Sequence, residues 1–114
     1  MKIYKMILIE MKNVLYNIKL EEQNTKETNI QLDLHKELGG EINVYTSFGY
    51  IQLLTENQII EIKHRKEWRK GLGNLLSYNE FFPEKKMMLY LYDIEKDEQI
   101  ERFCKKYKII VNYL

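Results

Sequence analysis

The 114-residue sequence has little of what disulfides, tight turns and metal clusters require, since it contains one cysteine, one proline, five glycines and two histidines. A single cysteine excludes an intramolecular disulfide and a multi-cysteine metal site, so we expect a reducing, intracellular location. Cys104 itself is interpreted as a core residue on a helix face. The scarcity of proline and glycine favours regular elements joined by short connections.

Long apolar runs and excess charge are lacking as well. No apolar run is long enough to cross a bilayer, so we expect no membrane partner. Lys5 and Glu10 interrupt the apolar start of the chain and no small-residue cleavage site follows, which argues against a signal peptide. The 18 basic and 17 acidic residues leave a net charge of +1, so the overall charge points to no particular partner. The length fits one domain, residues 1–114.

The apolar spacing predicts an α/β fold, in which a mixed sheet with a three-strand meander is flanked by helices. Helical spacing covers Met1 to Leu20, although residues 3–9 also fit a strand, and the polar residues 21–25 are interpreted as a connection. Thr25 or Thr28 is expected to cap a second helix that Gly39-Gly40 ends. The later elements are expected at Glu41–Thr46 (strand), Tyr50–Thr55 (strand), Gln58–Lys63 (strand), Trp68–Tyr78 (helix, with Pro83 ending the segment), Met87–Tyr92 (strand), Asp97–Tyr107 (helix) and from Ile109 (strand).

The most informative segment is Ile59-Ile60-Glu61-Ile62-Lys63. Residues two apart in a strand point to the same face, so Glu61 and Lys63 emerge side by side from an otherwise apolar strand. A buried charge is costly unless it has a partner or a function. The pair is therefore either an ion pair at the strand edge or part of a functional site.

A basic segment, Lys63 to Lys70, begins at the lysine of this pair. Such a run is commonly a solvated loop, and Trp68 within it is expected to anchor a helix to the core. Phosphates respond to the local field, however, so a basic patch on a nearly neutral protein permits nucleic-acid binding. His64 is interpreted as a phosphate contact or a surface residue, because it has no metal-ligand spacing to His35. The candidate DNA contacts are His64, Arg65, Lys66, Arg69, Lys70, Asn74 and Tyr78.

These segments, taken in order, resemble the PD-(D/E)XK, or restriction-endonuclease-like, nuclease superfamily. The family pattern is a helix with a glutamate, a hairpin ending in an acid, a strand ending in E-x-K and a helix with Q-x-x-x-Y. Here Glu27 lies on the helix before the meander, and Glu61-Ile62-Lys63 ends the third strand. The segment from Asn74 to Tyr78 corresponds to the Q-x-x-x-Y motif. The similarity runs from about residue 27 to the C-terminus, and residues 1–23 form a helical extension outside it.

The resemblance implies a metal-dependent DNA endonuclease with Mg²⁺ or Mn²⁺ as cofactor. Family members bind the metal through two carboxylates and the carbonyl of the residue between Glu and Lys, which here implies Glu61, the position of Gln52, and Ile62. Lys63 would orient the attacking water and stabilise charge on the phosphate. Glu27 matches the helix glutamate of the family, which is often an outer ligand. The implied catalytic residues are thus Glu27, Gln52, Glu61 and Lys63.

Gln52 departs from the family pattern, which has an acid at this position. An amide oxygen brings no negative charge, and Mg²⁺ prefers charged oxygen ligands, so weakened metal binding and cleavage are expected. Glu41 either compensates for the missing carboxylate or is a solvated residue at the start of a strand. The amide of Asn74 in place of the family glutamine is a milder change. Asn74 and Tyr78 either line a groove for DNA or simply pack and cap.

Several functions stay open at this point. The leading prediction is a PD-(D/E)XK endonuclease whose activity Gln52 weakens or abolishes, and the alternative is an inactive nuclease-fold module for DNA binding or assembly. A pure protein-interaction domain, and a Gln52 introduced to trap a complex, are further alternatives. Cutting both strands of a duplex needs two sites, which favours a homodimer whose interface the N-terminal helix could supply. Richness in lysine, isoleucine and asparagine is typical of AT-rich viral or mobile-element genomes.

Overall fold

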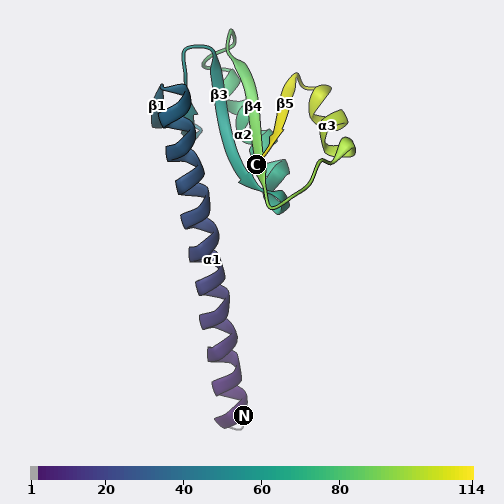
Figure 1. Ribbon diagram of the computed structural model, residues 1–114. Helices are drawn as coiled ribbons and strands as arrows, with labels where there is room; N and C mark the ends of the chain where they lie inside the picture. Colours follow the sequence, from purple (N-terminus) through teal and green to yellow (C-terminus); the bar gives the residue numbers. More distant parts are fainter. Residues whose placement is uncertain (1–2) are drawn as a thin grey trace.

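The computed structural model describes residues 3–114 and has a five-stranded mixed sheet with helices on both faces (Figure 1). The elements in chain order are α1 (Ile3–Leu38), β1 (Glu41–Thr46), β2 (Gly49–Leu54), β3 (Gln58–His64), the 3₁₀ turn η1 (Arg65–Glu67), α2 (Trp68–Asn79), β4 (Lys86–Tyr92), α3 (Glu98–Lys105) and β5 (Ile109–Tyr113). The predicted α/β class is therefore confirmed.

The order of strands in the sheet follows the chain, from β1 at one edge to β5 at the other. β1, β2 and β3 form the predicted antiparallel meander, whereas β4 is parallel to both β3 and β5. Parallel neighbours need a crossover connection, and α2 and α3 supply the two crossovers. The ends of β3 and β4 consequently lie side by side, with His64 opposite Tyr92.

A single helix, α1, stands where the sequence predicts two helices and a connection. Residues 21–25 continue the helix, because Glu21, Glu22 and Gln23 are good helix formers and no glycine or proline interrupts them. The strand alternative for residues 3–9 and the caps at Thr25 and Thr28 are therefore wrong. Gly39, with a φ of +75°, ends the helix as predicted.

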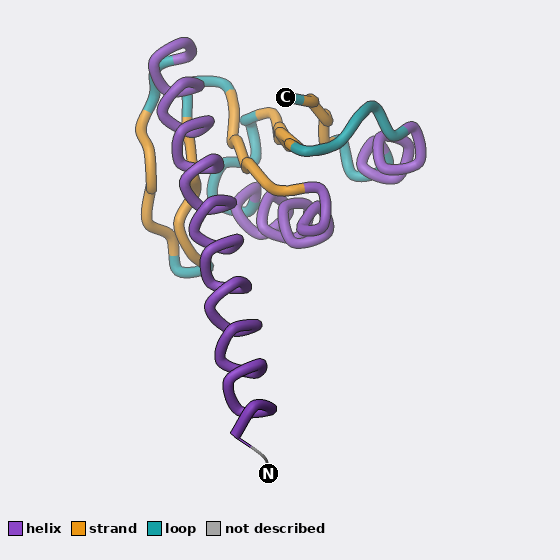
Figure 2. Tube along the Cα trace, turned by 60° about the horizontal axis from the view of Figure 1, so that its bottom comes forward, coloured by secondary structure: helices purple, strands orange, loops and turns teal. Residues whose placement is uncertain are grey.

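α1 covers one face of the sheet, and α2 and α3 cover the other (Figures 1 and 2). Leu34 of α1 belongs to a buried cluster on its face, whose other members are Leu53, Ile60, Ile62, Met88 and Tyr92. The opposite cluster contains Ile51, Ile59, Leu75, Leu89, Leu91, Ile100 and Cys104, together with Tyr78, Met87 and Ile109. Cys104 is thus a core residue as predicted, and burial raises the pKa of its thiol to about 11.

Gly71 allows α2 to lie close to the ends of β3 and β4. A Cβ atom on this residue would meet Leu89 Cδ1 at 2.6 Å and Lys63 Cγ at 3.0 Å. Any larger residue would force the buried Leu89 side chain, the Lys63 side chain or the helix itself to shift. This close approach sets the residues of α2 directly over Lys63.

The N-terminal half of α1 extends away from the sheet in both views (Figures 1 and 2). The molecule is elongated as a result, with principal extents of 59 × 30 × 27 Å. Between residues 3 and 114, no helix has the length and apolar content needed to span a membrane.

Candidate functional site

The candidate site lies where β2 and β3 stop pairing through their backbones. The last paired residues in this direction are Leu53 and Ile60. Beyond them, Gln52 Oε1 accepts a hydrogen bond from the Ile62 N–H at 2.6 Å, so a side-chain amide takes the place of a strand carbonyl. The Gln52 carbonyl instead accepts from Gln31 Nε2 of α1 at 2.8 Å. Gln52 therefore joins both strands and α1.

Four of the residues expected from the sequence lie together, with three of them surrounding one ammonium group. Lys63 Nζ lies 3.2 Å from Gln52 Oε1, 3.3 Å from Glu61 Oε2 and 3.9 Å from Glu27 Oε2. Gln52 Nε2 donates to the same Glu27 oxygen at 3.1 Å. The Lys63 side chain is 13% exposed, which limits screening of these contacts by water. The side chains at positions 52, 61 and 63 are thus brought together in one cluster.

Glu61 is the most deeply buried charged residue of the site, at 1% exposure. Its Oε2 accepts from Lys63 Nζ and from Asn74 Nδ2, the latter at 3.3 Å, whereas its Oε1 has no hydrogen-bond partner. Desolvation raises the pKa of Glu61, and the attraction of Lys63 and the hydrogen bond from Asn74 oppose this without cancelling it. The ionised carboxylate is therefore less stable here than in water.

The sequence analysis missed two residues of the site, namely Tyr92 and Gln31. Tyr92 donates its hydroxyl to Glu27 Oε1 at 3.1 Å, and its burial and the neighbouring carboxylate both raise the pKa of the phenol. Gln31 is 7% exposed and donates to the Gln52 carbonyl. A polar tip at the end of an apolar strand is the signal that could have identified Tyr92, because the ends of parallel neighbours meet at one edge of a sheet.

The oxygen atoms of the site are poorly placed to bind a divalent metal, because hydrogen-bond donors already face them. Gln52 Oε1, an implied ligand, already faces the Ile62 N–H and the Lys63 ammonium. Glu61 Oε2 likewise faces two donors. Mg²⁺ needs several oxygen atoms directed at it, and a neighbouring ammonium repels it. No group of three or more His, Cys, Asp or Glu side chains in residues 3–114 is placed to hold a metal ion. Binding of Mg²⁺ or Mn²⁺ stays an untested expectation, against which this donor set argues.

The basic residues that follow Lys63 lie on η1 and the first turn of α2. Arg65, Lys66, Arg69 and Lys70 are all exposed. We call these four residues the basic patch. A small cleft of about 180 Å³ adjoins it, lined by Leu20, Gln23, Asn24, Glu27, Lys63, Glu67 and Lys70. The basic patch is therefore continuous with the Lys63 site.

His64 is held by local contacts rather than presented to a ligand. Its Nδ1 accepts from the Lys66 N–H at 3.2 Å and caps η1, while Nε2 lies 3.4 Å from Asp93 Oδ2. Lys26 of α1 forms an ion pair with the same aspartate, and this contact lowers the pKa of Asp93. His64 thus orients the segment that carries the basic patch.

The side chains of Asn74 and Tyr78 both form hydrogen bonds within the fold. Tyr78 is 4% exposed and donates its hydroxyl to the Tyr50 carbonyl at 3.1 Å, so the interpretation of Tyr78 as a DNA contact is wrong. Asn74 donates to Glu61 within the site. Trp68 is partly buried against the core and meets Phe103 edge-on, with ring centroids 5.7 Å apart, which agrees with its predicted role as an anchor.

Three proteins of Acanthamoeba polyphaga mimivirus, each named for a KilA-N domain, are similar to this chain. L32 is 45% identical over 86 residues, which are 75% of this chain and 23% of L32. R878 is 36% identical over 101 residues, or 87% of this chain and 28% of R878. L33 is 40% identical over 86 residues, or 74% of this chain and 35% of L33. The chain thus spans between about a quarter and a third of the length of these relatives.

No family model matches this chain. No solved structure matches it either. The relatives correct the leading prediction, because all three are named for a KilA-N domain and none for a nuclease. The prediction of a metal-dependent endonuclease, with the hydrolase activity attached to it, is therefore wrong.

Proposed function

We propose that this chain is a catalytically inactive DNA-binding module, built on a restriction-endonuclease-like core. KilA-N domains are a DNA-binding family, and three viral proteins named for such a domain match most of this chain. The match covers a minority of each relative, so the proposal for this segment depends on its own surface.

The order of elements supports a nuclease-type core. A helix with Glu27, an antiparallel meander, a strand ending in Glu61 and Lys63, a helix and a parallel strand follow one another as that fold requires. Gln52 supplies the physical reason for inactivity. Its amide oxygen accepts hydrogen bonds from a backbone N–H and from Lys63, so the site satisfies itself where a nuclease would direct charge at a metal.

The basic patch is the observation that carries DNA binding. Four exposed cations within six residues lie at the start of α2, where the helix macrodipole adds partial positive charge. Arg69 lies 5.3 Å over the Trp68 ring, which limits the freedom of its guanidinium. The acidic neighbour Asp93 is engaged by Lys26 and His64, so it offsets the patch less than a free carboxylate would. Such a surface attracts a phosphate backbone without reading its sequence.

Fluorescence anisotropy with a labelled duplex, recorded at several salt concentrations, tests this proposal. The variant carries Arg65→Gln, Lys66→Gln, Arg69→Gln and Lys70→Gln. Removing one cation that neutralises a phosphate should lower the slope of log K against log salt by about 0.9, so removing all four should lower it by about 3 to 4. The matched control removes four exposed charges of α3 and the turn after it, outside the basic patch, through Arg102→Gln, Lys105→Gln, Lys106→Gln and Lys108→Gln.

The control should keep most of its affinity and its salt slope. An equal decrease in both variants would mean that total charge alone drives binding, and the patch would have no special role. No binding by the unaltered chain at low salt would remove DNA as a partner.

A further inference from the structure

The N-terminal half of α1 carries a row of apolar side chains that face solvent. Ile7, Met11, Val14, Leu15 and Ile18 are between 46% and 57% exposed. We call these five residues the apolar seam. A protein in water rarely leaves such a row uncovered, because contiguous exposed apolar surface marks an interaction site.

The spacing of the apolar seam is that of a coiled coil. Ile7, Met11, Val14 and Ile18 follow one another at intervals of four, three and four residues, which is the heptad spacing of residues that face a partner helix. Ile18 precedes Glu27 by nine residues, or about two and a half turns, so the two side chains point to opposite sides of α1. Since Glu27 contacts the protein's own sheet residues, the apolar seam faces away from the domain. A second helix can therefore approach it without obstruction.

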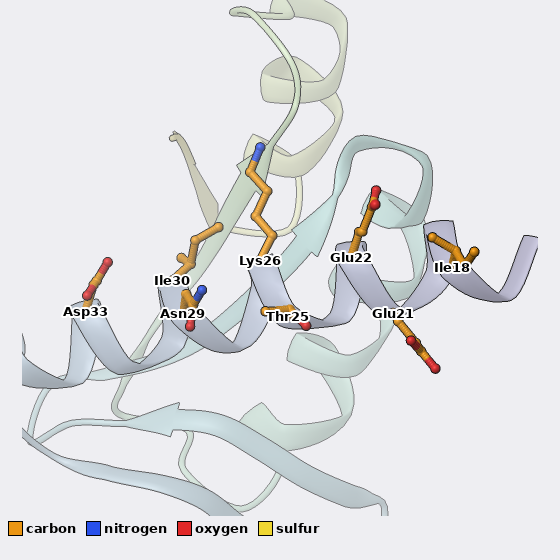
Figure 3. A pocket seen from close by; sticks show the side chains of 8 residues that line it. All are labelled: Ile18, Glu21, Glu22, Thr25, Lys26, Asn29, Ile30 and Asp33. Atoms are coloured by element: carbon orange, nitrogen blue, oxygen red, sulfur yellow. The ribbon is translucent and has the colours of Figure 1, made fainter. Parts of the chain in front are cut away.

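The apolar seam ends where α1 docks on its own domain. Figure 3 shows the helix beyond Ile18, where the same row continues through Glu22, Thr25 and Asn29 with polar and charged side chains. On the other side of the helix, burial begins at Gln23. The first half of α1 thus exposes apolar side chains along the seam and beside it, at Met6, Leu8 and Ile9, whereas the second half meets the sheet.

We propose that a second copy of this chain covers the apolar seam, so that two α1 helices form a parallel two-stranded coiled coil. Charge favours the parallel arrangement. Glu10 and Lys12 lie about 100° to either side of Met11, and Lys5 and Lys19 repeat the position of Lys12 one heptad away. These lysines stand outside the positions that touch the partner, but in a parallel pair their side of the helix (the lysine flank) lies next to the partner side that carries Glu10. An antiparallel pair would set the lysine flank against itself, which is repulsive.

The part of the contact that residues 3–20 supply is enough for a reversible dimer of this chain. Residues 3–20 span about 27 Å of helix, which corresponds to the small class of interfaces that bury less than about 1,200 Å². An isolated helix of this length is marginal in water, so pairing also stabilises the helix itself. Dimer formation should therefore depend on concentration in the micromolar range.

Sedimentation equilibrium of the full chain, without DNA, tests the dimer independently of the proposed DNA binding. The mass should approach twice 13.9 kDa as the concentration rises. Met11→Glu buries a charge in the seam and should raise the dissociation constant at least about 30-fold. Tyr16→Glu is the matched control, because Tyr16 is 66% exposed on the same part of the helix but lies outside the seam. It should change the dissociation constant less than about threefold.

A cysteine variant tests the direction of the helices. In the parallel pair, Ile7→Cys places two thiols against each other, and mild oxidation should link them; Cys104 is buried and does not compete. A mass that stays at one chain at all concentrations, or equal effects of Met11→Glu and Tyr16→Glu, would overturn the proposal. Crosslinking only in a mixture of Ile7→Cys and Ile18→Cys chains would show antiparallel helices and overturn the parallel arrangement.

Discussion

Replacement of Gln52 by leucine should destabilise the fold strongly, because this side chain joins β2, β3 and α1. Leucine nearly preserves the side-chain volume, so the cost is mainly that of hydrogen bonds and not of a cavity. The variant removes the acceptor of the Ile62 N–H, the neutral acceptor of Lys63 and the donor to Glu27 Oε2.

The largest part of the cost comes from the backbone N–H of Ile62. Ile62 has no exposed surface, so its N–H cannot exchange Gln52 for water. An unsatisfied buried donor costs about 1–3 kcal/mol. Lys63 and Glu27 keep other partners and add a smaller cost. The total should be about 2–4 kcal/mol, a large share of the stability of a small domain.

Urea unfolding, followed by the fluorescence of the single tryptophan, measures this change. Gln58→Leu is the control, because Gln58 lies in β3 and is partly buried, but its side-chain amide makes no hydrogen bond among the described residues. It should shift the free energy of unfolding by less than about 0.5 kcal/mol. A decrease below about 1 kcal/mol for Gln52→Leu would refute the assignment of its oxygen as the acceptor of the Ile62 N–H.

Two further predictions concern α2 and the buried carboxylate. Gly71→Ala should lower the free energy of unfolding by about 1–3 kcal/mol, because its Cβ would meet Leu89 Cδ1 at 2.6 Å. Gly73→Ala is the control: a Cβ on Gly73 has nothing within 4 Å, so this change should raise the free energy of unfolding by about 0.5–1 kcal/mol. Urea midpoints that shift in the same direction for both variants would contradict this packing. Because the pKa of Glu61 is raised in the folded state, its contribution to stability is full below its ordinary pKa and is lost as the pH rises above it. The stability of the unaltered chain relative to Glu61→Gln should thus increase on acidification toward pH 4.5, and a decrease would mean that ion pairing outweighs desolvation.

The strands and the central pair of the site could be predicted from the sequence because their signals are local. Glu61 and Lys63 are polar interruptions of an apolar strand, and strand periodicity alone puts them on one face. The tertiary partners of Gln52 could not be predicted in the same way. Its bonds to Ile62 and Gln31 depend on how β2 and β3 separate and on where α1 docks.

The continuity of α1 escaped prediction because polar residues 21–25 look like a connection. A helix with solvent on most sides needs no apolar residue at such positions, and good helix formers are enough to continue it. Tyr78 shows the opposite error. A tyrosine beside a site suggests a ligand contact, but the Tyr78 hydroxyl donates a hydrogen bond to the Tyr50 carbonyl within the core. The same limit applies to function, since an E-x-K motif specifies a geometry and not an activity.

An NMR titration of the ¹⁵N-labelled chain with a short DNA duplex tests the central proposal most directly. We expect the amide signals that move to belong to residues 63–70 and the helix turn that follows, while those of residues 55–58, at the opposite end of β3, stay in place. Signals that do not move at low salt, or that move chiefly in residues 102–108, would contradict a DNA interface at the basic patch.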